Sequence, residues 1–323
     1  MRNALSIDVE EWFCVSNFAK IIWPEDWPNM ESRIEMQIGR ILDILGQHSV
    51  KATFFILGWV AERHSEMVRN IALAGHEIAT HGYGHQLVSD LTPEQFREDL
   101  AWSLRLIREI TGIDCRGYRA PSFSIRRDMT WAWEILAEQG IEYDSSVFPV
   151  LHDRYGEPDA PRFSYRVWPR NSCSSSEKCG FDGAKPSNAA SGVILNSGGL
   201  RSARRSEALC EGRVATANQS AKTIIEIPPA TVRIAGRNIP VAGGGYLRLY
   251  PCWATKQAIQ RINREEHAAV VYLHPWELDP GQPRPPVSKL KLWRHHAGIG
   301  SLEDKLHRIL SDFEFGPLGE VVG

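Results

Sequence analysis

An alternation of short apolar runs with amphipathic helical stretches dominates the first half of the chain. Each run has the length of a buried strand, and in the stretch 31–45 apolar side chains recur every three or four residues, on one helical face. Strands and helices that alternate in this way form parallel sheets or β/α barrels. Seven or so such units indicate closure into a barrel. We expect strands over 5–9, 52–57, 77–79, 117–119 and 268–273, and helices over 31–45, 65–74, 92–110 and 129–138.

The helix expected over 92–110 carries explicit start and stop signals. Thr92 is a good N-cap residue, Pro93 suits the first helical position, and Gln95 stands at the capping-box position. Gly112 provides a stop, since glycine adopts the left-handed conformation that ends many helices.

The composition changes between residues 168 and 222. Ser, Ala, Gly, Asn and Arg dominate there, apolar residues are sparse and no period survives, which predicts a flexible surface insertion. Cys173 and Cys179 offer a metal clip as an alternative, but they lack the tight paired spacing of structural zinc sites. Strand-like patterning resumes at 224–227 and 232–234, so the insertion interrupts one domain spanning 1–323. We expect 281–323 to form a C-terminal helical extension packed on the barrel, with a closing helix over 302–313.

Charge and composition exclude several classes of partner. The chain of 323 residues has 37 basic and 39 acidic side chains, a formal net charge of −2, so no global field attracts nucleic acid. The first apolar stretch is too short for a signal peptide, and no run approaches the roughly 18 apolar residues of a membrane-spanning helix. We therefore expect a cytoplasmic protein. Its six cysteines lack paired CxxC spacing and are expected to be reduced thiols.

Two histidines four residues apart, His81 and His85, directly follow the strand expected over 77–79. If this segment starts a helix, both imidazoles share a face and can bind one metal ion. An HxxxH pair also arises as ordinary polar surface. Its position after a strand favours a site, because catalytic groups of parallel β/α folds collect at the carboxyl ends of the strands.

Acidic residues end the first strand. Residues two apart on a strand point the same way. We therefore expect Asp8 and Glu10 to project together into the opening at the carboxyl end of the barrel, while Val9 and Glu11 face elsewhere. One carboxylate can bind a metal ion and the other can accept a proton. The alternative is an exposed acidic turn before Trp12. Two histidines and a carboxylate leave coordination positions open for water and substrate, as in catalytic zinc sites.

A third histidine, His274, follows the strand expected over 268–273 and should lie at the same rim. An imidazole there can protonate a leaving amine, and a buried structural histidine is the alternative. Arg119 and Asp144 are further candidates, although each could form only a structural ion pair.

These segments, in this order, resemble the five motifs of the NodB-homology polysaccharide deacetylases, carbohydrate esterase family 4. The resemblance covers nearly all the chain apart from the insertion, and rests on 8–10, 81–85, 119–121, 143–146 and 273–275. A subgroup encoded beside exosortase and exopolysaccharide loci looks closer still. The segments similar to that subgroup are 9–13, 155–163, 241–246 and 274–280.

The resemblance implies a distorted (β/α)7 barrel and a divalent metal ion held by one carboxylate and two histidines. His81 and His85 match the histidine ligands, and Asp8 matches the catalytic base. Val9 stands where the family usually has its metal-binding aspartate, so Glu10 is the expected ligand, with Glu11 as the alternative. Zn²⁺ is the expected ion, with Co²⁺ and Ni²⁺ as alternatives.

The remaining roles follow from the other motifs. Arg119 matches the arginine that orients the base, and His274 matches the general acid, with Asp144 as its partner. The family usually has a tyrosine after the proline of its third motif, which donates a backbone N–H to the oxyanion. Here Ser122 follows Pro121, and the backbone donor survives. We expect Tyr83 and Trp276 to contact the substrate as well.

The resemblance implies a hydrolase that removes N-acetyl groups from an amino-sugar polysaccharide, or from its lipid-linked precursor, in exopolysaccharide biosynthesis. Two alternatives stay open. Because Val9 replaces the usual metal-binding aspartate, one alternative is a metal-independent cyclic-amide hydrolase of the allantoinase-like type. A non-catalytic carbohydrate-binding protein, whose tryptophans stack on sugar rings, is the other.

Overall fold

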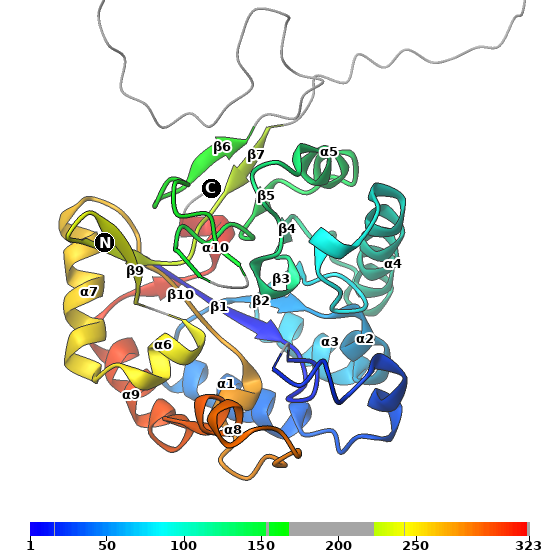
Figure 1. Cartoon of the computed structure of the whole chain (residues 1–323), viewed down its shortest axis with the longest axis horizontal. Coiled ribbons are helices and arrows are strands. Elements are labelled where there is room, and N and C mark those ends of the chain that lie inside the picture. Colours follow the sequence, from blue (N-terminus) through cyan, green and yellow to red (C-terminus); the bar gives the residue numbers. More distant parts are fainter. Residues whose placement is uncertain (16, 153–154, 168–222, 242, 322–323) are drawn as a thin grey trace, which may run out of the picture.

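A curled parallel sheet forms a half-barrel with helices around it (Figure 1). The computed structural model describes residues 1–15, 17–152, 155–167, 223–241 and 243–321, and the insertion predicted for 168–222 lies outside them. The main sheet has nine described strands. Two of them are antiparallel β6 (Tyr165–Val167) and short β11 (Phe315–Gly316), and the other seven run parallel. Their order is β10 (Val270–Leu273), β1 (Asn3–Val9), β2 (Thr53–Ile56), β3 (Glu77–Thr80), β4 (Gly117–Tyr118), β5 (Tyr143–Asp144) and β7 (Ile224–Glu226).

The pairing register brings several strand ends to one edge. Ile7 lies opposite Leu273, Val9 opposite Ile56, and Ile56 opposite Thr80. The residues that follow β1, β3 and β10 therefore emerge side by side at the carboxyl rim, where parallel β/α folds place their sites.

Closure of the barrel is incomplete in the described part of the chain. Pro228 and Pro229 follow β7, and because proline has no backbone N–H to donate, a ladder cannot continue there. Ala230 is the next residue with a donor, and its N–H bonds the Val270 carbonyl of β10 at 3.0 Å. The prediction of an α/β fold with a distorted barrel of seven parallel strands is confirmed, and the sheet is a half-barrel that stays open between β7 and β10.

Helices cover the outer face of the sheet (Figure 1), and the helix predictions hold with small shifts at the ends. Helix α4 begins with the expected capping box of Thr92 and Gln95 and ends at Gly112, which has φ +75°. The α helices are α1 (Ile34–Gln47), α2 (Gly58–Arg63), α3 (Ser65–Leu73), α4 (Pro93–Thr111), α5 (Thr130–Glu138), α6 (Gly244–Leu249), α7 (Cys252–Arg264), α8 (Lys289–His296), α9 (Ile299–Asp312) and α10 (Leu318–Val321). The described residues also form four short 3-10 helices, η1 (Pro24–Asn29), η2 (Val88–Asp90), η3 (Pro121–Phe123) and η5 (Pro275–Leu278).

The periodicity read in the first helix marks its buried face. Ile34, Ile38, Ile41 and Leu45 are buried in the main core cluster between α1 and the sheet. Burying each of these side chains contributes roughly 1.5–3 kcal/mol before the entropy cost of ordering it.

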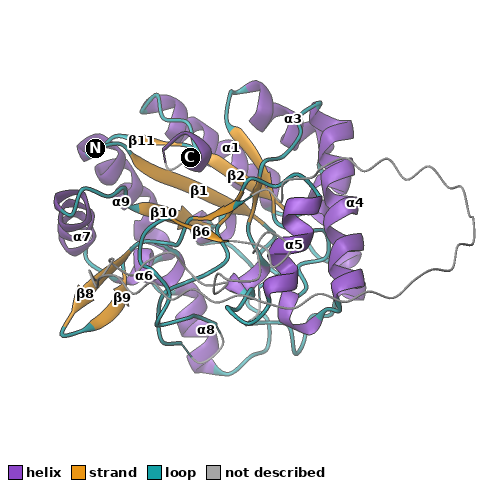
Figure 2. Ribbon diagram, turned by 90° about the horizontal axis from the view of Figure 1, so that it is seen from above, coloured by secondary structure: helices purple, strands orange, loops and turns teal. Residues whose placement is uncertain are grey.

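The last forty residues combine helices with a strand. Helices α8 and α9 are followed by β11, which pairs with β1 and so adds an element that a purely helical extension lacks. Figure 2 shows the N-terminus and β11 on one side of the molecule and α8 on the other. Strands β8 (Thr231–Ile234) and β9 (Arg237–Pro240) form a separate hairpin near α7.

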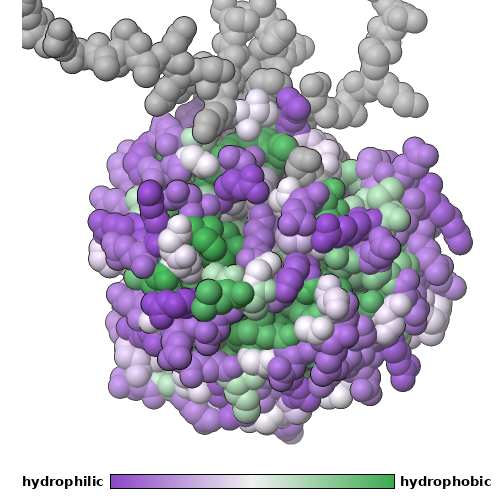
Figure 3. Space-filling model, turned by 180° about the vertical axis from the view of Figure 1, so that it is seen from behind, coloured by the Kyte–Doolittle hydropathy of each residue, from purple (hydrophilic) through white to green (hydrophobic). Residues whose placement is uncertain are grey.

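None of the described helices is long and apolar enough to cross a membrane. On the face opposite to that of Figure 1, apolar side chains gather in the middle and hydrophilic ones surround them (Figure 3). Cys14, Cys115 and Cys252 are free thiols, and the other three cysteines lie outside the described residues.

Candidate metal centre and active site

Three predicted metal ligands meet at the carboxyl rim of the sheet. Glu10 follows β1, and His81 and His85 follow β3, with β2 between the two strands. One potential ligand atom from each of the three lies within 4.8 Å of the other two. Two imidazoles and a carboxylate form the donor set of a catalytic zinc-type site, so these residues fit a divalent ion.

The histidine segment is a loop and does not start a helix. Gly82 and His85 have positive φ angles of +73° and +53°, which an α-helix excludes. The carboxylate of Asp99 on α4 accepts the backbone N–H groups of Tyr83 at 2.8 Å and Gly84 at 3.0 Å, so it fixes the turn that a helix would have replaced. The two imidazole rings still approach, with centroids 5.4 Å apart. Sequence reasoning missed Asp99, because no local signal links it to the loop.

Burial and neighbouring imidazoles set the charge state of Glu10. Burial raises the pKa of its carboxyl, but His85, His274 and His81 outweigh burial and hold the pKa well below its ordinary value. One carboxylate oxygen pairs with Nε2 of His85, and the other accepts the indole N–H of Trp276 at 3.1 Å. Glu10 is thus an anion, the form that binds a cation.

His81 has the complementary protonation state. Burial lowers the pKa of its imidazole to about 4, so the ring is neutral near pH 7. Its Nδ1 lies 2.7 Å from the Arg119 carbonyl, an acceptor only, so Nδ1 carries the proton and Nε2 keeps the free lone pair. A backbone partner of this kind fixes the ring orientation of a metal-binding histidine.

Asp8 lies beside these three residues and forms an ion pair with Arg119. The Arg119 guanidinium donates to Asp8 Oδ1 at 2.6 Å, and it is fixed in turn by Ser6 and by Ser145. Arg119 is fully buried. The structure therefore brings together the predicted base and the arginine predicted to orient it.

His274 lies across the site from these groups. Its Nε2 is 3.8 Å from Asp8 Oδ2 and 3.8 Å from Glu10 Oε1, and its side chain is 18% exposed. Burial lowers the pKa of His274, but the negative charges of Glu277, Glu10 and Asp8 outweigh burial. Together they raise the pKa from its ordinary 6.5 to about 9. A protonated imidazole thus faces the carboxylates.

Asp144 is not the partner of His274, so that prediction is wrong. Asp144 on β5 accepts the indole N–H of Trp133 at 3.1 Å and the hydroxyl of Ser146, and it hydrogen-bonds Glu226. Glu277 takes the predicted place, with Oε2 at 3.0 Å from His274 Nδ1. A carboxylate three residues after a strand-ending histidine was a local signal that could have found it.

Glu11, the alternative ligand, points away from the site as strand parity predicted for it. Its carboxylate accepts the backbone N–H groups of Arg33 and Ile34 and the hydroxyl of Ser32. It therefore caps the N-terminus of α1, which begins three residues later than expected.

The four residues predicted to contact substrate differ in where their side chains lie. The Trp276 ring stacks on His274, with centroids 5.2 Å apart, and belongs to the site. Pro121 is buried in η3, and Ser122 after it has φ +54° and is half-buried. Tyr83 points elsewhere: its hydroxyl donates to Glu62 on α2, and its ring packs edge-on against Trp102 on α4.

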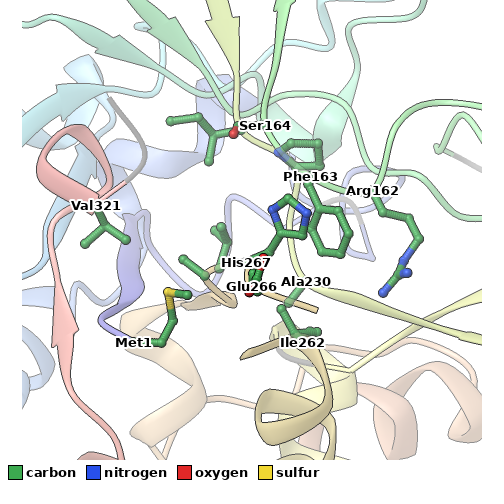
Figure 4. A pocket seen from close by; sticks show the side chains of 13 residues that line it. Met1, Arg162, Phe163, Ser164, Ala230, Ile262, Glu266, His267 and Val321 are labelled. Carbon is green, nitrogen blue, oxygen red and sulfur yellow. The ribbon is translucent and has the colours of Figure 1, made fainter. Parts of the chain in front are cut away.

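A separate cavity of about 220 Å³ lies beside Met1 and the start of β10 (Figure 4). Phe163 and His267 stack along it, with ring centroids 3.7 Å apart. The nearby Arg162 guanidinium already pairs with Glu265 and with the Thr231 carbonyl. The charge of Arg162 is thus compensated by Glu265.

Comparisons with known proteins agree with this geometry. Residues 35–143 match the family model described as polysaccharide deacetylase, and residues 199–323 match a domain of unknown function, DUF3473. A peptidoglycan deacetylase of Helicobacter pylori is 34% identical over 35% of this chain and 38% of that protein. A peptidoglycan-N-acetylglucosamine deacetylase of Bacillus cereus is 34% identical over 29% of this chain and 35% of its own length. The matches thus span little more than a third of each relative.

The fold comparison extends further along the chain. A crystal structure of a provisionally named polysaccharide deacetylase from Mycobacterium smegmatis superposes with a TM-score of 0.55. It covers 99% of this chain and 87% of the other, at 17% sequence identity, so it shows a shared fold. The polysaccharide deacetylase model thus matches about a third of the chain, and the solved structure shows a shared fold along nearly all of it.

Proposed function

We propose that this protein is a metal-dependent hydrolase that removes acetyl groups from N-acetylated amino sugars. The observation that carries the proposal is the convergence of a metal-type trio, an arginine-bound aspartate and a protonated histidine at one rim. Glu10, His81 and His85 supply the ligands, and Asp8 and His274 flank them. Hydrolysis of an amide needs these three capabilities together.

The residues divide the reaction between them. A divalent ion held by the trio would polarise the acetamide carbonyl and lower the pKa of a water molecule. Asp8, oriented by Arg119, accepts the proton of the attacking water as its oxygen bonds the carbonyl carbon. His274 then donates a proton to the sugar nitrogen as the carbon–nitrogen bond breaks, and acetate leaves. The backbone N–H of Ser122 is the proposed donor to the oxyanion.

The substrate class is part of the proposal. The relatives from Helicobacter pylori and Bacillus cereus are named as peptidoglycan deacetylases, which supports a polymer or oligomer of N-acetylated amino sugars. The motif resemblance narrows this proposal to an exopolysaccharide or its lipid-linked precursor. The cytoplasmic location stays a prediction.

Acetate release tests the reaction class. Protein loaded with Zn²⁺, Co²⁺ or Ni²⁺ is incubated with N-acetylglucosamine oligomers, and acetate is measured with and without a chelator. We expect release that the chelator abolishes and that added metal restores. Release that survives complete removal of metal would favour the cyclic-amide alternative. Tight oligomer binding without release would favour the non-catalytic one.

A further inference from the structure

We propose that Glu277 and Arg248 position His274 for proton donation, an inference that rests on the proposed function. Arg248 lies on α6 and Glu277 on η5, both within the C-terminal segment that matches a domain of unknown function. That segment would then supply the acid of the reaction and also the residues that set its orientation.

Glu277 holds His274 at two points. Its Oε2 accepts the backbone N–H of His274 at 2.9 Å and faces the ring Nδ1 at 3.0 Å. A carboxylate that only accepts hydrogen bonds requires the proton to sit on Nδ1. The other ring nitrogen, Nε2, therefore faces Asp8 and Glu10, the side on which the leaving amine must lie.

Arg248 compensates and fixes the Glu277 carboxylate. Its Nε donates to Glu277 Oε1 at 2.6 Å, and both side chains are almost completely buried. The same guanidinium donates to the carbonyls of His295 at 2.7 Å and Ala297 at 2.6 Å, at the end of α8. Arg248 is thus held by backbone groups and cannot follow a displaced carboxylate.

The contact with His274 distinguishes this ion pair from ordinary packing. A buried ion pair adds little net stability, because the desolvation of both ions offsets their attraction. Placed against His274 Nδ1, the same pair determines which nitrogen faces the substrate. The site therefore has two arginine–carboxylate pairs, Arg119 with Asp8 for the base and Arg248 with Glu277 for the acid.

A comparison of two probes isolates this role. Tri-N-acetylchitotriose releases an amine that needs a proton, whereas 4-nitrophenyl acetate releases a phenolate that leaves without one. Glu277→Gln is expected to lower kcat on the amide roughly tenfold to a hundredfold, part of the effect of a positioned acid, with KM within about twofold of wild type. Its kcat on the ester is expected to stay near wild type. Arg248→Lys, which keeps the charge, should lie between Glu277→Gln and wild type.

Asp279→Asn is the matched control. Asp279 is a buried carboxylate at the end of the same 3-10 helix and pairs with Arg33 at 2.5 and 3.1 Å, away from His274. It should change stability while leaving the ratio of amide to ester rates unchanged. Parallel losses on both probes in Glu277→Gln, or full amide activity in that variant, would overturn the positioning role.

Nitrogen NMR of the imidazoles separates this inference from the proposed function. The structure predicts a hydrogen-bonded proton on His274 Nδ1 that Glu277→Gln weakens, whether or not acetate is released. A His274 without a proton on Nδ1 in the wild-type protein contradicts the inference. Wild-type protein with the predicted signal but no activity on either probe contradicts only the proposed function.

Discussion

Replacing Glu226 by glutamine is expected to stabilise the protein at neutral pH. Glu226 and Asp144 are fully buried, hydrogen-bonded to each other, and too close for both to ionise in the half-barrel. Burial raises the pKa of Asp144 to about 6 from its ordinary 3.8, and burial together with Asp144 raises the pKa of Glu226. The folded state therefore keeps a proton that the unfolded chain releases.

The sign and size of the effect follow from this linkage. A carboxyl group with a raised folded-state pKa contributes its full stability below its unfolded pKa, near 4, and loses it as the pH rises toward its folded-state pKa. Glutamine removes this loss for Glu226, whose ordinary pKa is 4.5 and whose raised pKa favours a proton on the folded protein. By neutral pH the loss is at most about 3 kcal/mol as an order of magnitude, at about 1.4 kcal/mol per pH unit. Glutamine keeps the bond that Glu226 Oε1 accepts from Val147 N–H at 2.9 Å and offers Asp144 an N–H that needs no proton uptake.

Urea unfolding of wild type and Glu226→Gln at pH 4.5 and pH 7.5 measures the difference. We expect the variant to gain up to about 3 kcal/mol at pH 7.5 and little at pH 4.5. Glu142→Gln, an exposed carboxylate paired with Arg116 on the surface, is the control and should change stability by less than about 1 kcal/mol. Equal destabilisation of Glu226→Gln at both pH values would refute the shared-proton reasoning.

Three further substitutions and one control test the site and its surroundings. Gly82→Ala puts a Cβ 2.7 Å from Asp99 Oδ2 at φ +73°, so metal affinity should fall and stability should drop by about 1–2 kcal/mol. The control is Gly112→Ala, at φ +75° in open space, which should lose stability in calorimetry without losing metal affinity. Glu11→Gln should weaken the cap of α1 by about 0.5–1 kcal/mol in thermal unfolding, with metal content unchanged; loss of metal would make Glu11 a ligand. His274→Ala should lower amide turnover about a hundredfold or more with metal content intact, and normal turnover would remove it from the mechanism.

Local patterns predicted most of the fold. The period of apolar residues located α1, and the capping box with its terminal glycine gave α4 to within about a residue. The start of α1 was placed too early because the cap comes from Glu11, more than twenty residues before the first helical turn. The sheet stays open between β7 and β10, where Pro228 and Pro229 offer no backbone N–H, and a sequence does not show which strand lies beside them.

Site residues at strand ends were predictable, and those that act from a distance were not. Parity extended past β1, which ends at Val9, predicted that Glu10 and Glu11 point in different directions, and Glu10 lies beside His81 and His85 while Glu11 caps α1. Asp99 and Arg248 reach the site from helices, and no spacing in the sequence links them to the residues they hold. The family pattern put Asp144 beside His274, but in this chain it pairs with Glu226 while Glu277 occupies that place.

Anomalous diffraction at the zinc edge, from crystals of the zinc-loaded protein, would locate the bound ion. We expect one strong peak within bonding distance of a Glu10 carboxylate oxygen, His81 Nε2 and a ring nitrogen of His85, with Glu11 outside the coordination sphere. A zinc ion bound by Glu11 in place of Glu10, or no peak at this rim in protein saturated with zinc, would contradict this expectation.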